Sequence, residues 1–149
     1  MKIFRIILYG VIIFLLFLVP LQRVEIANLK PVEGIWIYKA SESVAIETDT
    51  GDLGLGRTIE DAVEDIKRNS TGIIYLDTAK FVFVDETASD ELIAFRPFVK
   101  GNVCISKWDG KGNVSDAVQY ADAHKVGVKY KKWNLGSNLP EIDLVFREK

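Results

Sequence analysis

The chain has 149 residues, of which 48% are hydrophobic and 27% are charged, and its formal net charge is −2. This length and composition suit one globular domain and exclude a disordered polypeptide. The balance of charge lacks the basic surplus of a nucleic-acid-binding domain, so no nucleic-acid partner is expected. The chain has one cysteine, Cys104, which excludes an internal disulfide framework and a structural zinc site built from thiolates.

An uncharged apolar run lies near the start of the chain. It covers residues 6–22, and Arg5 and Arg23 flank it. At a rise of 1.5 Å per residue this run covers about 26 Å, close to the thickness of a bilayer core. No cleavage site with small residues follows it. We therefore expect residues 1–23 to form an uncleaved signal anchor with one transmembrane helix; a cleaved signal peptide and a buried helix are the alternatives.

The predicted anchor also predicts a location. Ile6, Leu16 and Val19 are taken as anchor residues that contact membrane lipid. Lys2 and Arg5 favour a cytoplasmic N-terminus, because basic residues are retained on the cytoplasmic side. The sequence thus predicts a single-pass protein of the cell membrane whose C-terminal domain lies outside the cytoplasm.

The remainder of the chain divides into a predicted tether, residues 24–33, and a predicted domain, residues 34–149. Short β-rich runs and helical runs interleave irregularly, which is typical of helices packed on one mostly antiparallel or mixed sheet. The sequence therefore predicts an α+β domain with about three helices. The expected strands are 34–40, 43–49, 72–77, 80–86, 102–108, 126–133 and 141–148, and the expected helices begin after Thr58, Ser89 and Ser115.

The helix after Thr58 carries the clearest pattern. Ile59, Ala62, Val63 and Ile66 recur at the spacing that places them on one helix face. Acidic residues fill its first turns and basic residues its end, an order that complements the helix dipole. Thr58 is a favourable N-cap residue, so this helix is expected to begin there.

The stretch GDLGLGRT, residues 51–58, resembles a phosphate-binding P-loop with Arg57 in place of the lysine. An arginine does not replace that lysine, because the planar guanidinium has a different reach from a compact ammonium. The short helix that follows is also a poor crossover for a parallel sheet. We therefore expect no nucleotide here, and we interpret the glycines as serving a turn and a close approach.

Acidic residues precede the same glycines. Asp49, Asp52 and Arg57 are the best candidates for a site that binds a small ligand or a cation. The spacing does not fit a calcium-binding EF-hand loop, which requires a glutamate where Thr58 stands. No metal site is therefore predicted.

No catalytic constellation stands out. His124 is the one histidine, and it lies near the end of the predicted third helix, where it would ease the helix dipole. No serine, aspartate or glutamate has a spacing that singles it out as a nucleophile or an orienting carboxylate. The sequence predicts no enzyme activity and no cofactor.

The order of elements resembles a known family. Residues 54–86 and 89–110, GLGRTIEDAVEDIKRNSTGIIYLDTAKFVFVDE and SDELIAFRPFVKGNVCISKWDG, are similar to the N-terminal domain of spore germinant-receptor C-subunit lipoproteins of endospore-forming bacteria. The chain lacks the lipobox of that family, and Thr78 stands where a histidine is expected. The resemblance implies a stand-alone relative of one module, a non-catalytic receptor component associated with sporulation or germination.

Two functions are expected from these observations. The first is a non-enzymatic, membrane-anchored interaction module that lies outside the cytoplasm and binds an envelope protein or itself. The second is an extracytoplasmic protein that binds a small ligand or a cation through residues 49–58. Neither involves a nucleotide.

Overall fold

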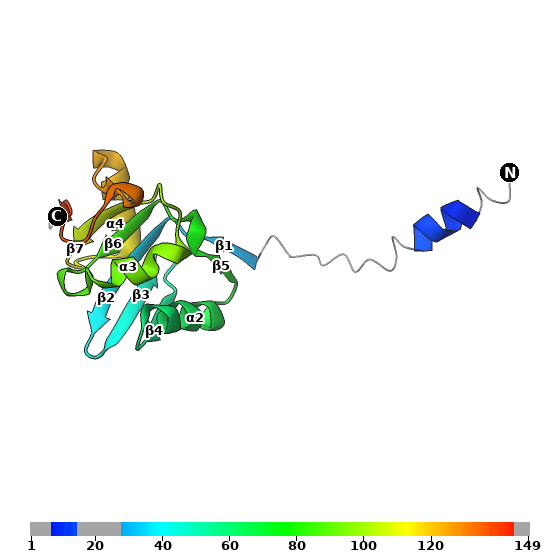
Figure 1. The fold of residues 1–149 in the computed structure, drawn as a ribbon, viewed down its shortest axis with the longest axis horizontal. Helices are drawn as coiled ribbons and strands as arrows, with labels where there is room; N and C mark the ends of the chain where they lie inside the picture. The colour runs from blue at the N-terminus through cyan, green and yellow to red at the C-terminus, as the bar shows by residue number, and fades with distance from the viewer. Residues whose placement is uncertain (1–6, 15–27, 145–149) are drawn as a thin grey trace, which may run out of the picture.

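The computed structural model describes residues 7–14 and 28–144, and within these residues the fold is α+β (Figure 1). The strands are β1 (Leu29–Pro31), β2 (Gly34–Ala40), β3 (Ser43–Thr48), β4 (Leu53–Gly56), β5 (Ile73–Tyr75), β6 (Phe81–Val84), β7 (Cys104–Trp108), β8 (Val128–Lys129) and β9 (Glu141–Ile142). The helices are α2 (Ile59–Asn69), α3 (Glu91–Phe95) and α4 (Val114–His124), with 3₁₀ turns η2 (Leu76–Thr78), η3 (Glu86–Ala88), η4 (Arg96–Phe98) and η5 (Tyr130–Lys132).

The main sheet is mixed. Its strands run in the order β4-β3-β2-β6-β7-β8, and β9 pairs with β7. β2, β6, β7 and β9 are parallel to one another, whereas β3, β4 and β8 enter through antiparallel pairs. A separate two-stranded sheet pairs β1 with β5 in parallel. The amino-terminal ends of β6 and β7 therefore lie side by side at one edge of the fold.

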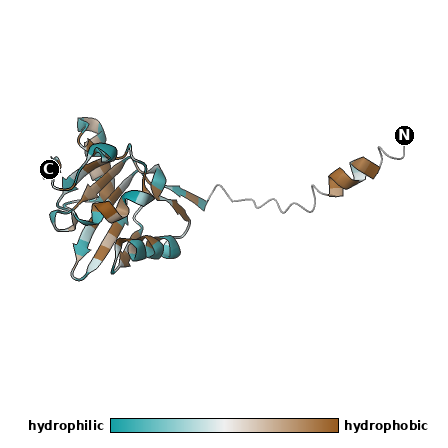
Figure 2. Ribbon diagram, viewed as in Figure 1, coloured by the Kyte–Doolittle hydropathy of each residue, from teal (hydrophilic) through white to brown (hydrophobic). Residues whose placement is uncertain are grey.

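Both faces of the main sheet are covered. One apolar cluster joins sheet residues such as Ile35, Val82 and Ile105 to α2 and α3, and its members Ile59 and Leu92 are fully buried. The cluster on the other face joins aromatic side chains of β6 and β7 to α4. Figure 2 shows the central strands in apolar colours and much of α2 in polar colours. Strand β6 is buried on both sides, as its apolar run FVFV requires.

Helix α2 confirms the predicted pattern. Thr58 caps it, because the side chain accepts a hydrogen bond from the backbone N–H of Asp61 at 3.2 Å. Ile59, Ala62, Val63 and Ile66 are its buried residues.

The glycine-rich stretch before α2 forms part of the sheet. Gly54 and Gly56 lie in strand β4, which the sequence analysis did not predict. A Cβ atom at Gly54 would lie 2.3 Å from the carbonyl oxygen of Ala62, and a Cβ atom at Gly56 would lie 2.3 Å from the backbone nitrogen of Ala62. Gly51 has φ +82° in the turn between β3 and β4. The glycines thus serve one turn and the close packing of β4 against α2.

The prediction of a transmembrane helix is wrong for the part of the chain that the structure describes. Of the N-terminal run the structure describes residues 7–14, and these residues are helical. Among residues 7–14 and 28–144, no helix has the length and apolar character to span a membrane. The single-pass location predicted from that helix is corrected with it. Ile6, Leu16 and Val19 lie outside the described residues.

Several other boundaries differ from expectation. The segment predicted as a tether contains β1 and the fully buried Val32. The caps of the later helices also change: Asn113 replaces Ser115 as the cap of α4, and Ser89 donates to the carbonyl of Glu86 instead of capping α3. Asn is an equally good N-cap, so local propensity alone did not decide between neighbouring positions.

Candidate functional site

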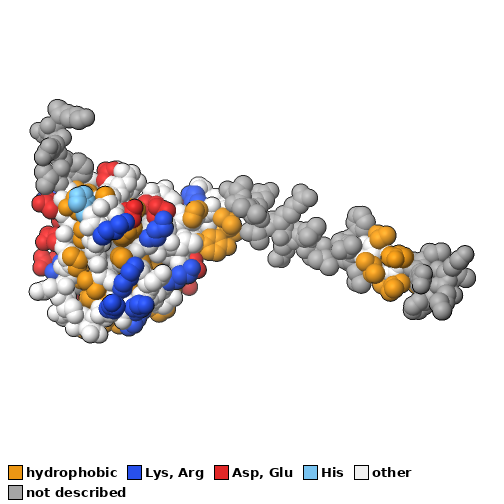
Figure 3. All heavy atoms as spheres, turned by 90° about the horizontal axis from the view of Figure 1, so that it is seen from above, with side chains coloured by type: hydrophobic (Ala, Val, Ile, Leu, Met, Phe, Trp, Pro, Cys, Tyr) orange, Lys and Arg blue, Asp and Glu red, His pale blue; other side chains and the backbone are white. Residues whose placement is uncertain are grey.

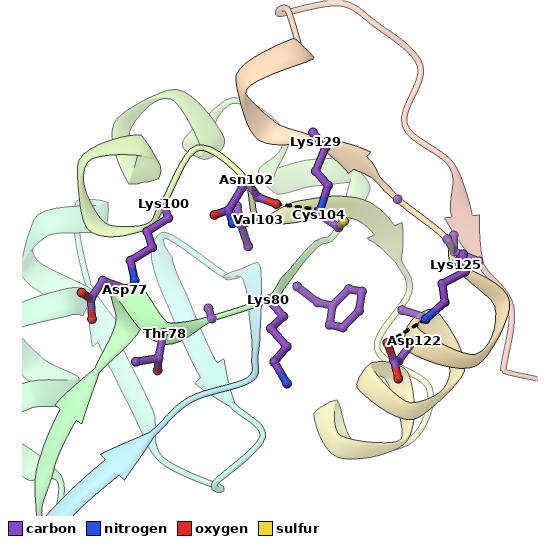
Figure 4. Close-up of a pocket in the computed structure, with 15 residues that line it drawn as sticks. Asp77, Thr78, Lys80, Lys100, Asn102, Val103, Cys104, Asp122, Lys125 and Lys129 are labelled. Carbon is purple, nitrogen blue, oxygen red and sulfur yellow. Dashed lines mark hydrogen bonds and ion pairs between the residues drawn. The ribbon is translucent and has the colours of Figure 1, made fainter.

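A cavity of about 540 Å³ opens at the amino-terminal ends of β6 and β7, beside the C-terminal end of α4 (Figure 4). This volume lies within the range of small-molecule sites. Three separate segments of the chain line it. The lining residues are Asp77, Thr78, Ala79, Lys80, Phe81, Lys100, Asn102, Val103, Cys104, Ala121, Asp122, Lys125, Val126, Gly127 and Lys129.

The floor of the cavity is apolar. Phe81 and Cys104 begin β6 and β7 and are partners in the parallel pair. Ala121 in α4 and Val103, the residue before β7, are fully or almost fully buried. They belong to the two apolar clusters of the core, so the floor of the cavity is continuous with the core. The half-buried Cys104 and Val126 present apolar surface to the cavity above this buried support.

Four lysines surround this floor, and two of them have carboxylate partners. The Lys80 amine lies 2.8 Å from a carboxylate oxygen of Glu33, and the Lys125 amine lies 3.2 Å from Asp122. The hydrogen bond to Glu33 raises the pKa of Lys80, so this amine remains charged. These two lysines are locally neutralised.

The other two lysines carry positive charge without an ion pair in the described residues. Lys129 donates to the backbone carbonyl of Asn102 at 2.9 Å, which fixes its amine over the cavity without neutralising it. Lys100 comes from the loop after η4 and points into the same region (Figure 4). Asp77 is the lining carboxylate that forms no ion pair there, and it lies beside Lys100 in this view. Lysines thus outnumber carboxylates at the rim.

The rest of the surface makes this concentration of lysine informative. The whole chain has a formal net charge of −2, so a lysine-rich rim runs against the average charge. Figure 3 shows a face of the domain on which several lysine and arginine side chains lie near one another, with acidic side chains beside some of them. A concave site lined by one sign of charge raises the local concentration of ions of the opposite sign.

The three ligand residues predicted from sequence are not brought together. Asp49 accepts hydrogen bonds from the backbone N–H groups of Glu33 and Gly34 at 3.1 and 3.2 Å, so its carboxylate holds the start of β2. Arg57 lines a shallow hollow of about 280 Å³ that neither predicted aspartate lines.

Asp52 is also engaged within the fold. Burial opposes its ionisation, but hydrogen bonds from Thr50 at 2.7 Å and from Lys30 at 3.3 Å outweigh burial and lower the pKa of its carboxyl. The Asp52–Lys30 ion pair joins the β3–β4 turn to β1.

Residues that could bind a metal ion do not converge in the part of the chain that the structure describes. In the described ranges, no group of three or more His, Cys, Asp or Glu side chains is placed to hold a metal ion. His124 is exposed at the end of α4, where its ring stacks on Tyr120 with centroids 4.1 Å apart and its Nδ1 lies 3.0 Å from the Tyr120 carbonyl oxygen.

The sequence analysis missed the cavity lysines. Lys100 and Lys129 are 29 positions apart, and neither belongs to a motif with a known chemical spacing. The sequence did contain one signal for the cavity: the apolar residues Phe81 and Cys104, at which two strands begin, each follow a lysine within a few positions. No family model matches the chain, and comparison with curated proteins and with solved structures gives no match either. The resemblance to germinant-receptor subunits stays a prediction.

Proposed function

We propose that this protein is a non-enzymatic binding protein that holds a small anionic ligand in the lysine-rimmed cavity. The observation that carries the proposal is the convergence of four lysines, from three separate segments of the chain, on one cavity with an apolar floor. A cluster of exposed lysines on a convex surface would be an ordinary solvated face. The concave arrangement differs, because several ammonium groups can contact one ligand at the same time.

The charges favour an anion over a cation. The rim holds four lysines and two aspartates, and one of these aspartates is already paired with Lys125. A cation in the cavity would be repelled by Lys100 and Lys129. An anion would be repelled by Asp77, the one lining carboxylate without an ion pair in the described residues. This differs from the cation or ligand site predicted at residues 49–58, where the two aspartates serve the fold.

The proposal is tested by titrating the protein with pyrophosphate and following backbone amide signals by NMR. We expect shifts at the strand starts 79–81 and 102–104 and at residues 121–129, which line the cavity. Lys100→Gln and Lys129→Gln should each weaken binding about fivefold, the upper range for an exposed ion pair.

Lys132→Gln is the matched control, because Lys132 is an exposed lysine on η5 that does not line the cavity. It should change the affinity less than twofold. Equal weakening by all three substitutions would indicate a diffuse charge effect and reject the cavity as the site. No shifts with millimolar pyrophosphate and none with a millimolar carboxylate such as octanoate would together reject anion binding.

Self-association is a second candidate, and one surface favours it. Leu29 and Pro31 of β1 lie opposite Ile73 and Tyr75 of β5, so these four residues share one face, here called the apolar face. Ile73 and Tyr75 are 48% and 40% exposed. An apolar hollow of about 430 Å³ is lined by Leu29, Pro31, Tyr75 and Thr78. A second copy of the chain would bury this face against its own equivalent.

Sedimentation velocity over a range of protein concentrations tests this candidate. We expect a concentration-dependent dimer that Ile73→Ser and Tyr75→Ser abolish. Leu135→Ser is the matched control, because Leu135 is 64% exposed and lies outside the apolar face. A monomer at all concentrations would reject self-association.

A further inference from the structure

The charged side chains that line the cavity are unevenly distributed, and their positions determine where an anionic group can bind. Lys100 and Lys129 lie on the side of the loop that contains Asn102, and the Lys129 amine is bonded to that loop (Figure 4). Lys125 and Asp122 lie on the opposite side, where they pair with each other at the end of α4. Net positive charge is therefore concentrated on one side.

The end of α4 adds to this asymmetry. The helix ends at His124, and its last residues turn toward the cavity through Ala121, Asp122 and Lys125. The C-terminal end of a helix carries partial negative charge from its unpaired carbonyl groups. An acidic group is therefore disfavoured next to α4 and favoured near Lys100 and Lys129.

The floor between the two sides is apolar and formed largely by residues without free polar groups. Val103 and Ala121 are 1% and 0% exposed and support the floor from within the core, so its exposed apolar surface comes from the half-buried Cys104 and Val126 and from the edge of Phe81. An inorganic anion would leave this surface in contact with water. A ligand with a hydrocarbon body would cover it, and each buried methylene would add to the affinity.

We infer that the ligand of this cavity is an amphipathic anion, with an acidic head group between Lys100 and Lys129 and an apolar body on the floor toward α4. This inference rests on the proposed function, because it specifies the chemical class of the anion. Asp77 sets a limit on the head group, since its carboxylate lines the same cavity, forms no ion pair in the described part of the chain, and repels a second negative charge. A monoanionic carboxylate fits this arrangement better than a phosphate dianion.

Cys104 provides a direct measurement. It is the one cysteine of the chain, it is free and half-buried, and it lines the floor. A ligand body that covers the floor should slow alkylation of Cys104 by iodoacetamide in the full-length protein. The rate measured against ligand concentration gives a dissociation constant for that occupancy.

The experiment compares hexanoate, octanoate and octylammonium as probes. We expect octanoate to bind about 15-fold more tightly than hexanoate, because each of its two additional methylenes contributes about fourfold when buried. Octylammonium has the same chain with the opposite charge and should give no protection. Equal affinities for hexanoate and octanoate, or protection by octylammonium, would overturn the inference.

Two substitutions with opposite expected signs test the head-group position. Lys100→Gln should weaken octanoate binding about fivefold, and Asp77→Asn should strengthen it, because the first removes an attracting charge and the second a repelling one. Lys132→Gln again serves as the control. Weakening by both substitutions would overturn the placement of the head group.

The pyrophosphate titration separates failure of this inference from failure of the proposed function. If pyrophosphate shifts the cavity signals and the alkanoates give no protection, the cavity binds anions and the amphipathic ligand is rejected. If neither pyrophosphate nor the alkanoates bind, the proposed function is rejected as well.

Discussion

The close packing of β4 against α2 predicts that Gly54→Ala destabilises the domain strongly. The added Cβ atom would lie 2.3 Å from the Ala62 carbonyl oxygen and 2.7 Å from the Cβ atom of Ile66. Since ordinary contacts begin near 3.4 Å, α2 would have to retreat from the sheet by about 1 Å. The obstructing atoms belong to the helix backbone or lie next to it, so rotation of a side chain gives no relief.

The expected cost follows from this displacement. Ile59, Ala62 and Ile66 are fully buried along the same helix face, so a shift of α2 loosens all of their contacts at once. We expect a loss of about 3 kcal/mol, at the upper end for overpacking of a core. For a domain of this size that loss lowers the midpoint of thermal unfolding by about 10 °C.

Thermal and urea unfolding followed by circular dichroism measure the effect. Gly101→Ala is the control, because a Cβ atom added there would lie 3.6 Å from its nearest neighbour, Cβ of Lys131, and φ at Gly101 is not positive. It should change stability by less than about 0.5 kcal/mol. Unfolding of Gly54→Ala within that same margin of the wild type would refute the packing role assigned to the glycine.

Three further substitutions test local interactions. Thr58→Ala removes the oxygen that accepts the Asp61 N–H bond at 3.2 Å and should cost about 1 kcal/mol in urea unfolding, whereas Thr58→Ser should retain most of the stability. Hydrogen bonds from the backbone N–H of Leu55 and from Arg68 lower the pKa of Asp65. The contribution of Asp65 to the free energy of unfolding is therefore present above the ordinary carboxyl pKa and is lost as pH falls through the lowered value. Asp65→Asn should lose less stability than wild type on acidification. Burial raises the pKa of Tyr130 to about 12. The contribution of the neutral phenol to the free energy of unfolding is therefore complete below about pH 10 and is lost as pH rises toward 12. Tyr130→Phe should remove the late phenol ionisation from an ultraviolet titration and resist alkaline unfolding better than wild type.

Local patterns predicted those elements whose boundaries are set by local chemistry. β2 has the predicted bounds, and α2 begins at the predicted cap because Thr58 and the apolar face agree with each other. β4 was missed because two of its four residues are glycine, which is unfavourable in strands. Only the tertiary packing against α2 explains why glycine is required there. Likewise, β1 depends on pairing with β5, more than forty positions later, which no local pattern reveals.

The N-terminal prediction failed for a different reason. An uncharged run of apolar residues identifies a segment that avoids water, but hydropathy alone does not establish a helix that spans a bilayer. Of the helices in residues 7–14 and 28–144, none has the length and apolar character for that role. Length of the helix, and not apolar character alone, decides whether a segment can cross a bilayer.

The candidate site was hidden from the sequence because parallel strands bring together residues that are distant along the chain. Phe81 and Cys104 become neighbours through the β6–β7 pair, and Lys129 joins them through β8, which pairs with β7 in the opposite direction. Each lysine alone is indistinguishable from a solvated surface residue. The predicted residues Asp49 and Asp52 were closer in sequence and carried a more visible pattern, yet the fold uses their carboxylates to hold β2 and β1 in place. Clustered charge in a sequence thus identified positions that the fold itself requires, whereas the ligand site that we propose depends on the charge of Lys100 and Lys129, for which the described residues provide no ion pair.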